Sequence, residues 1–289
     1  MRWMLFSCII TLFSFLWISV SMASPAKDKL FLQKEEFVAY SLTGWEDGFV
    51  DWIKLQQLLE ELENETYQAP KNATLGKNRN IIADSPGYIL DRKSFTTSFL
   101  IAYYEGKDST IEIPKKMVHA RLNGQMLEEI MQKKLGAYTT YYNPTNEERA
   151  TNIALSAEAI HGAVVFPGEI FSFNETVGER TEDKGYKRAP VIVQGELAED
   201  IGGGICQVSS TLFNAVDLHG IEMVERFTHS RSVPYVPPGR DATVSWWGPD
   251  FSFKNLYNEP IVLVAQAENG ILTIEIFSSE TVEHFRTEQ

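Results

Sequence analysis

The sequence predicts an α+β protein: a small N-terminal α+β domain over residues 30–134, a β-rich domain over 135–280, and a polar tail over 281–289. Two observations lead to this prediction. Helix-like and strand-like patterns alternate in the first segment, whereas short β-like runs separated by glycine and proline dominate the second. Within the second segment, one strongly apolar helical run at 205–219 is expected to be a buried helix with a Gly-Gly-Gly-Ile-Cys motif at its N-terminus.

The first 23 residues have the pattern of a secretory signal peptide. Arg2 supplies a short positive start, residues 3–20 are almost wholly apolar, and Ser21-Met22-Ala23 offers small residues to signal peptidase. The alternative is an uncleaved N-terminal anchor, because about 18 apolar residues can cross a bilayer. Both interpretations place the rest of the chain outside the membrane. We therefore expect a secreted or extracytoplasmic protein that contacts the membrane only if this segment is retained.

The composition limits the expected partners. The 289 residues carry a formal net charge of −13, and their hydrophobic fraction of 44% is enough for a buried core. Nucleic acid is not an expected partner, because phosphate binding needs a basic surface. We expect neither a metal nor a cofactor. Cys206 is the only cysteine after the signal, no two histidines stand at ligand spacing, and the sequence has no phosphate loop or dinucleotide fingerprint.

The first segment has six predicted elements. Apolar residues at helical spacing predict helices over 50–62, 95–104 and 118–135. Residues 80–90 have the pattern of two strands joined by a Pro-Gly turn, and residues 109–113 alternate as a short strand does. Together these elements predict the small α+β domain.

The second segment begins with a predicted helix over 146–160. The helix at 205–219 follows three glycines and ends at Gly220. The remaining predicted elements are short strands punctuated by glycine and proline. They cover residues 163–173, 191–193, 242–247, 261–267 and 271–277.

Cys206 is the most informative residue of the second segment. It follows Gly202-Gly203-Gly204-Ile205 and would lie in the first helical turn, where unpaired amides and the helix dipole favour a thiolate. The glycines would let a substrate backbone approach, and the amides near residues 205–207 would face a developing oxyanion. The alternative is a structural role, because free cysteine is among the most buried residue types.

Six blocks of sequence follow one another in the second segment: 149–152, 167–174, 185–186, 202–212, 225–230 and 235–243. They include Pro-Gly-Glu-Ile-Phe-Ser-Phe-Asn, the Gly-Gly-Gly-Ile-Cys-Gln run and Tyr-Val-Pro-Pro-Gly-Arg-Asp-Ala-Thr. In this order they resemble the VanW family, over about residues 141–277. Residues 66–117 more weakly resemble a small peptidoglycan-binding type of domain that often precedes a VanW domain.

The resemblance implies a bacterial protein associated with the cell wall. The family takes its name from an accessory protein of glycopeptide-resistance clusters, and some members act as L,D-transpeptidases with a cysteine nucleophile. The cysteine at the matching position is Cys206. The implied partners are peptidoglycan stem peptides.

A cysteine nucleophile usually needs a base. His229 is the candidate base, because it lies in a β-like segment between two arginines inside one of the matching blocks. Asp241 follows a Pro-Pro-Gly turn in another block and is the candidate to orient the imidazole. The alternatives are a hydrogen-bonded structural histidine and an aspartate that only forms a turn.

Further residues are candidates for substrate binding. A guanidinium group suits the carboxylates of a stem peptide, Gln207 offers a side-chain donor, and Tyr235 is expected to line the site. The alternative for each arginine, Arg240 included, is surface pairing in an acidic protein. The candidates are Gly202, Gly203, Gly204, Gln207, Ser209, Arg226, Arg231 and Tyr235.

The predicted reaction is acyl transfer. Cys206 would attack the carbonyl of the third residue of a tetrapeptide stem, expel the terminal D-alanine, and pass the acyl group to an amine of another stem. With water as the acceptor, the same site would be an L,D-carboxypeptidase. The alternative from a different class is a non-catalytic peptidoglycan-binding protein of wall maintenance or glycopeptide resistance. Trp246 and Trp247 would then help to bind wall peptide, and Cys206 would be structural.

Overall fold

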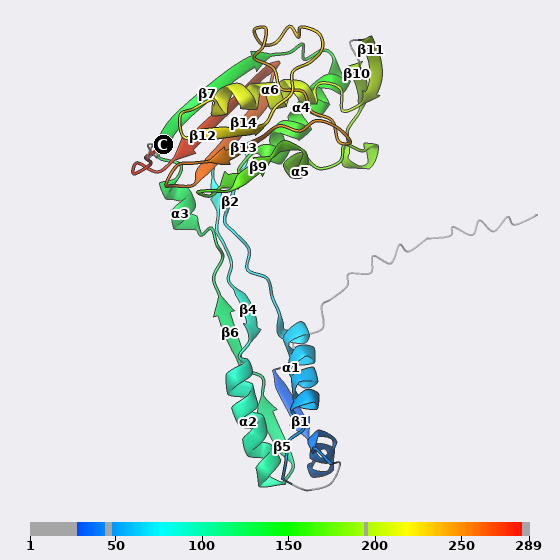
Figure 1. Cartoon of the computed structure of the whole chain (residues 1–289), viewed down its shortest axis with the longest axis vertical. Helices are drawn as coiled ribbons and strands as arrows, with labels where there is room; N and C mark the ends of the chain where they lie inside the picture. The colour runs from blue at the N-terminus through cyan, green and yellow to red at the C-terminus, as the bar shows by residue number, and fades with distance from the viewer. Residues whose placement is uncertain (1–27, 44–47, 194–195, 285–289) are drawn as a thin grey trace, which may run out of the picture. The chain divides into compact units, whose positions relative to one another are not determined.

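A computed structural model describes residues 28–43, 48–193 and 196–284, which form two compact units (Figure 1). Unit 1 extends to Gln68 and includes Tyr88–Met117, and unit 2 contains Ala69–Gly87 and the chain from Val118 onward. The predicted signal peptide lies outside the described residues. No described helix combines the length and the apolar character that a membrane span requires.

Unit 1 consists of two helices and short paired strands. The helices α1 (Trp52–Thr66) and α2 (Arg92–Glu105) confirm two of the predicted helices, and the carboxylates of Asp51 and Asp91 accept hydrogen bonds from their first-turn amides. Strand β1 (Lys29–Leu32) pairs with β5 (Ser109–Glu112), and β4 (Gly87–Leu90) pairs with β6 (Lys115–Val118). A 3-10 helix, η1 (Lys34–Tyr40), completes the core, whose largest buried side chains include Leu55, Leu59, Phe95 and Phe99.

Unit 2 is built on a four-stranded antiparallel sheet. Its order is β7 (Lys133–Tyr141), β15 (Ile271–Ser278), β14 (Ile261–Glu268) and β8 (Val164–Val165). Asn269 and Gly270, both with positive φ, form the two-residue turn between β14 and β15, as expected for an Asn-Gly hairpin. The strands predicted at 261–267 and 271–277 are therefore confirmed.

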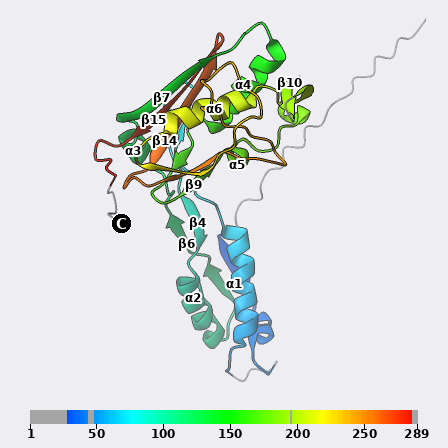
Figure 2. The ribbon, with the colours of Figure 1, turned by 45° about the horizontal axis from the view of Figure 1, so that its top comes forward.

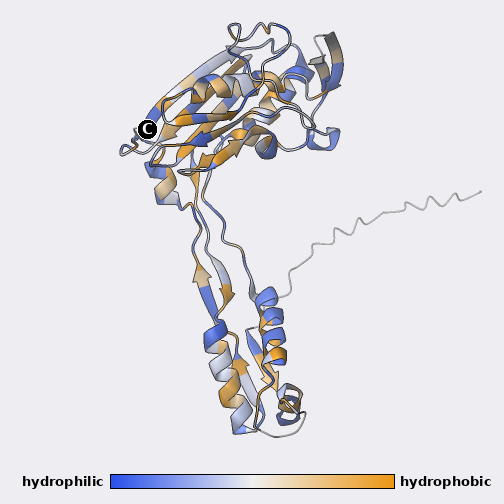
Figure 3. Cartoon of the chain, in the orientation of Figure 1, coloured by the Kyte–Doolittle hydropathy of each residue, from blue (hydrophilic) through white to orange (hydrophobic). Residues whose placement is uncertain are grey.

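Both faces of this sheet are buried. Ile261, Leu263 and Ala265 of β14 contribute to a core with α4 (Glu147–Ile160) and α6 (Ile205–Val216). Val262 and Val264 contribute to a second core with α3 (Gly124–Glu129) and β2 (Thr74–Leu75). Figures 1 and 2 show α6 beside α4 on the first face, and Figure 3 shows that apolar residues concentrate on these strands and on α6.

The second buried face explains why residues 69–87 and 118–134 belong to unit 2, although the sequence placed them in the first domain. The apolar stripe over 118–135 does not form one helix. Its residues Leu122, Leu127 and Ile130 are buried as a loop and the short α3, whose start is fixed by a bond from the Met126 N–H to the Asn123 side chain. Likewise, β3 (Ile81–Ile82) pairs with β2 rather than with the strand at 87–90.

The remaining strands surround the two long helices of unit 2. The three-stranded sheet has the order β12 (Ile221–Glu225), β13 (Ser252–Asn255) and β9 (Ile170–Ser172), and a short helix, α5 (Phe173–Val177), follows β9. A hairpin joins β10 (Arg188–Val193) to β11 (Glu196–Ile201). The strand predicted at 242–247 is wrong: this segment has only a single bridge, between Thr243 and Phe227.

Candidate active site

Cys206 lies in the first turn of α6, as the glycine run predicted. Gly204 precedes the helix with a φ of 111° and provides no side-chain cap. The amides of Ile205 and Gln207 donate to the carbonyls of Gly202 and Gly204, whereas the Cys206 N–H has no acceptor among the residues that the structure describes. The Cys206 thiol is partly buried, with its Sγ 3.4 Å from the Val244 carbonyl oxygen. One free amide is thus present at the thiol itself.

The three predicted catalytic residues lie together. Nδ1 of His229 is 2.6 Å from Oδ2 of Asp241, and the same oxygen accepts the His229 backbone N–H at 2.6 Å. Because Asp241 engages Nδ1, Nε2 is the ring nitrogen left free for the Cys206 thiol, and the interaction between imidazole and thiol shifts the pKa of both groups. Both partners of the ion pair are buried, at 6% and 9% side-chain exposure. This is the arrangement of nucleophile, base and orienting carboxylate.

The electrostatics favour a thiolate–imidazolium pair. Burial opposes ionisation of the Cys206 thiol, but its hydrogen bond with His229 and the neighbouring Thr243 lower the thiol pKa from its ordinary value. Burial also opposes protonation of His229, yet the contacts with Cys206 and Asp241 raise the imidazole pKa. Burial opposes ionisation of Asp241 too, and the hydrogen bonds from His229 nevertheless lower the pKa of this carboxyl.

Two hydroxyl groups of α6 hold the segment that follows Asp241. Ser209 Oγ donates to the Ala242 carbonyl at 2.6 Å, and Ser210 Oγ accepts the Ala242 N–H at 2.9 Å. The N–H and carbonyl of Ala242 are thus bonded to side chains of α6 and are not available for pairing with a neighbouring strand. This explains why the strand predicted at 242–247 does not begin there. Ser209 is fully buried. It therefore positions Asp241 and does not serve as the substrate contact that was predicted.

Gln207 is also a positioning residue. Its side chain is 1% exposed, and its amide nitrogen donates to Thr140 Oγ1 and to the Tyr141 carbonyl, both at 3.0 Å. Its amide oxygen accepts from Nη2 of Arg149 at 2.9 Å. The helix turns this side chain toward β7, so the prediction that Gln207 donates to substrate is not supported.

The three glycines make room for protein groups. A β-carbon at Gly203 would lie 2.5 Å from the Ala189 carbonyl oxygen, and one at Gly204 would lie 3.2 Å from Nη1 of Arg149. At Gly202, whose φ is +88°, it would lie 3.4 Å from the Arg180 β-carbon. The sequence analysis assigned this free space to a substrate backbone, but the hairpin and two arginine side chains fill it.

The predicted arginines and Tyr235 have different surroundings. Nη2 of Arg226 donates to the Gly239 carbonyl, and Arg240 donates to Asp217 and Asn214, so neither guanidinium is placed on the thiol. Arg231 is exposed. Tyr235 does lie near the site, because burial together with the nearby Cys206 raises the pKa of its hydroxyl, and its interactions with Ser210 and Arg149 oppose this shift.

Two arginines that the sequence analysis did not assign to the site, Arg149 and Arg180, flank the glycine run and interact electrostatically with Cys206. Burial lowers the pKa of both guanidinium groups, although an arginine remains cationic. Arg149 lies in a quoted sequence block, and Arg180 lies between two blocks. The available signal was the glycine run itself, since consecutive glycines can mark a close approach of other protein groups to the backbone.

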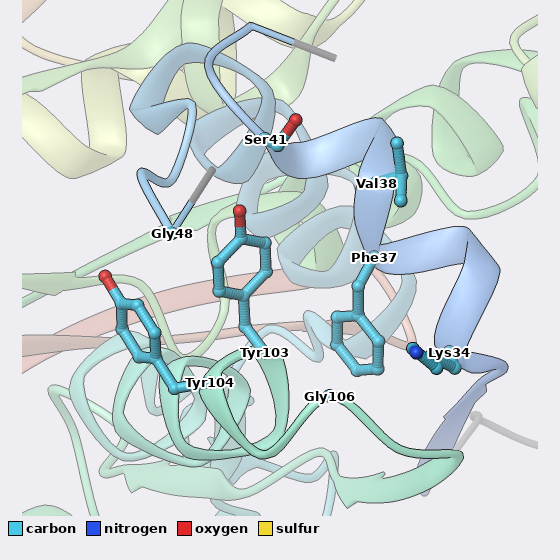
Figure 4. Close-up of a pocket in the computed structure, with 8 residues that line it drawn as sticks. All are labelled: Lys34, Phe37, Val38, Ser41, Gly48, Tyr103, Tyr104 and Gly106. Atoms are coloured by element: carbon cyan, nitrogen blue, oxygen red, sulfur yellow. The ribbon is translucent and has the colours of Figure 1, made fainter. Parts of the chain in front are cut away.

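Other groups in the molecule do not join this site. His161 contacts the backbone of Ala265 and Gly76 and is structural. Within the described ranges, no three side chains of His, Cys, Asp or Glu are grouped as a metal site requires. Unit 1 has a surface hollow of mainly aromatic and small residues, and none of its described lining residues is a cysteine, histidine or carboxylate (Figure 4). Its lining residues are Lys34, Phe37, Val38, Ser41, Gly48, Tyr103, Tyr104 and Gly106.

A family model and two known proteins resemble this chain. The family model described as VanW like protein matches residues 148–277. The uncharacterized protein YoaR of Bacillus subtilis (strain 168) is 48% identical over 233 residues, which cover 81% of this chain and 77% of that protein. The vancomycin B-type resistance protein VanW of Enterococcus faecalis (strain ATCC 700802 / V583) is 33% identical over 115 residues, 38% of this chain and 42% of that protein. No solved structure matches. The fold-defining blocks, the coverage of YoaR and the family match together show that this chain belongs to the VanW family.

Proposed function

We propose that this protein is an extracytoplasmic, cell-wall-associated acyltransferase that acts on peptidoglycan stem peptides as an L,D-transpeptidase. The observation that carries the proposal is the contact of Cys206 with His229, which Asp241 orients, at the N-terminus of α6. The similarity to a vancomycin-resistance protein supports a role in the cell wall. The apolar residues 3–20, followed by small residues, support export or anchoring.

In the first step, the Cys206 thiolate attacks the carbonyl carbon of the third stem residue. A C–S bond forms, and the Cys206 N–H, which has no acceptor among the described residues, would donate to the oxyanion. The C–N bond to the terminal D-alanine then breaks, and the His229 imidazolium supplies the proton that the leaving amine takes up. The products of this step are a thioester on Cys206 and free D-alanine.

In the second step, the amine of another stem attacks the thioester. Neutral His229 accepts a proton from this amine, the new amide C–N bond forms, and the C–S bond breaks to regenerate the thiolate. Asp241 holds Nδ1 of His229 throughout, so Nε2 faces the reacting atoms in both steps. Water in place of the amine would give carboxypeptidase activity instead.

The deciding experiment is incubation of the mature protein with a disaccharide-tetrapeptide, followed by mass spectrometry of the protein and of the muropeptide. The wild-type protein is expected to release D-alanine and to carry an acyl adduct, and Cys206→Ala should do neither. A matched control is Thr243→Val, which removes a weak thiol contact at 3.8 Å and keeps the nucleophile. Unchanged muropeptide in the wild type, with binding that Cys206→Ala retains, would instead identify a non-catalytic wall-binding protein.

A further inference from the structure

Arg180 and Trp246 each have a buried N–H group without an acceptor. Nη1 of Arg180 and Nε1 of Trp246 are shielded from solvent, and neither donates a hydrogen bond within the described part of the chain. The Arg180 guanidinium carbon lies 6.0 Å from the centroid of the Trp246 ring. Because a buried donor without an acceptor is costly, two neighbouring ones point to a ligand that accepts hydrogen bonds.

The other contacts of Arg180 fix the direction of its guanidinium group. Nη2 donates to Asn174 Oδ1 at 2.7 Å, and Nδ2 of Asn174 donates to the carbonyls of Ser245 and Pro249 on either side of the tryptophans. The stem of Arg180 lies against Gly202, four residues before Cys206. These bonds hold Nη1 beside Trp246 and close to the nucleophile.

The charges around the two arginines are not balanced by direct contacts. Among the described residues, no carboxylate lies within 4.0 Å of the guanidinium nitrogens of Arg149 or Arg180. Asp250 acts on Arg180 at longer range, and its oxygens accept from Ser172, from the Asn174 N–H and from the Phe251 N–H. Partly buried cations without a contacting anion are unusual in a chain of net charge −13. An anionic ligand would balance them.

We propose that Arg180 and Trp246, with Arg149 beside them, form a subsite for the α-carboxylate of the amino acid that Cys206 expels. This inference rests on the proposed acyl transfer. It identifies the residues that would select the donor stem peptide by binding its terminal carboxylate. The carboxylate of the leaving residue lies within one residue of the scissile carbonyl, at most about 3.6 Å along the chain. Its anchor must therefore lie near the thiol, and the Arg180 guanidinium is close enough to interact electrostatically with Cys206. A planar guanidinium and an indole N–H suit the two carboxylate oxygens.

The test compares two donors, a tetrapeptide that ends in a free carboxylate and the same peptide as its C-terminal carboxamide. The wild type is expected to prefer the acid by roughly 10- to 100-fold in kcat/KM, as for a charge-assisted hydrogen bond. Arg180→Gln should bring this ratio near one, and Trp246→Phe, which keeps a ring but removes the N–H, should reduce it in part. Trp247→Phe is the matched control, because Trp247 contacts Trp246 but is 89% exposed, and it should keep the ratio.

A binding measurement separates this inference from the proposed reaction. Calorimetry with Cys206→Ala protein should show tighter binding of the acid than of the amide, and Arg180→Gln in that background should abolish the difference. This result would support the carboxylate subsite even if the wild type released no D-alanine. Equal affinity for acid and amide, or a preference that survives both Arg180→Gln and Trp246→Phe, would overturn it. Trp246→Phe alone decides the outcome if Arg180→Gln does not fold.

Discussion

The two units bury different kinds of side chain. Among the described residues of unit 1, the buried polar side chains are Ser41 and Thr66, and the core consists of Leu, Ile, Val, Phe and Ala. Unit 2 buries many more, including four on α6 and Thr140, which is hydrogen-bonded to that helix. They are Thr140, Asn152, Ser156, Asn174, Gln207, Ser209, Ser210, Thr211, Asp241, Ser252, Asn255, Ser278 and Ser279.

The bonds of these polar groups differ as well. Thr66 donates to the Leu62 carbonyl of its own helix, which is a local contact. The polar residues of α6 instead connect segments far apart in the chain, such as Gln207 with β7 and Ser209 with Ala242. A polar group is buried at acceptable cost only when it is hydrogen-bonded. The buried polar side chains of α6 therefore fix the relative positions of the segments that they join, whereas the apolar core of unit 1 makes no such directional bonds. The comparison indicates that unit 2 is organised to position side chains.

The largest expected effect comes from removing a core leucine in either unit. Leu212→Ala on α6 and Leu55→Ala on α1 each remove a fully buried side chain, so each should cost about 2–5 kcal/mol of unfolding free energy. In urea unfolding followed together with thiol alkylation, Leu212→Ala is expected to alter Cys206 reactivity. Leu55→Ala should leave it unchanged in protein that remains folded. A loss of thiol reactivity in Leu55→Ala would contradict the assignment of the site to unit 2 alone.

A smaller effect is expected from Gly203→Ala. Its β-carbon would meet the Ala189 carbonyl oxygen at 2.5 Å, and backbone on both sides must shift, at a cost of about 1–3 kcal/mol. Gly106→Ala is the control in unit 1, because the added β-carbon would meet no neighbouring atom. Only the left-handed φ of 60° is unfavourable for alanine, and it should lower the unfolding free energy by about 1 kcal/mol. Denaturant midpoints measure both. An equal or smaller loss in Gly203→Ala would mean that the hairpin at Ala189 yields to the added methyl group.

The smallest of these effects concerns the pH dependence of thiol alkylation. The pKa of Cys206 is lowered and that of His229 is raised, so the thiolate forms at lower pH than in a free cysteine and the imidazolium persists to higher pH than in a free histidine. Iodoacetamide should therefore react with the wild type with an apparent pKa below that of a free thiol. In His229→Gln the thiol loses its partner, burial raises its pKa, and the rate at neutral pH should fall roughly tenfold per unit of pKa. The same pH profile in both proteins would show that His229 does not ionise the thiol.

The sequence predicted the elements whose determinants are local. The helices at 92–105 and 147–160 are preceded by Asp91 and Asn146, whose side chains cap them, and the β14–β15 hairpin has its Asn-Gly turn. It failed at 118–135 and at 242–247 for the opposite reason. There, burial against the second face of the sheet and hydrogen bonds from α6 decide the structure, and neither contact is encoded near those residues.

The same distinction applies to the site. Cys206, His229 and Asp241 could be predicted to lie together because their blocks carry a family pattern and their side chains suit one another chemically. Arg180 and Trp246 were not assigned to a common site, since 66 positions separate them and only the fold brings them together. Gln207 and Ser209 were misjudged because a helical position near a nucleophile can face either inward or outward, and both face inward.

The anchoring of Ala242 to α6 by Ser209 and Ser210 separates the residues that hold the site from the segment that connects them. Cys206 is part of α6, Asp241 is fixed to it through Ala242, and His229 is fixed to Asp241 by both its ring and its backbone N–H. The connecting residues 230–240 thus join two ends that are already in place. The exposed residues of this segment, such as Ser232, Pro234 and Pro238, can vary without displacing Cys206, His229 or Asp241. In the proposed reaction, exchanges at these positions would change the surface beside the site and leave the reacting groups in place.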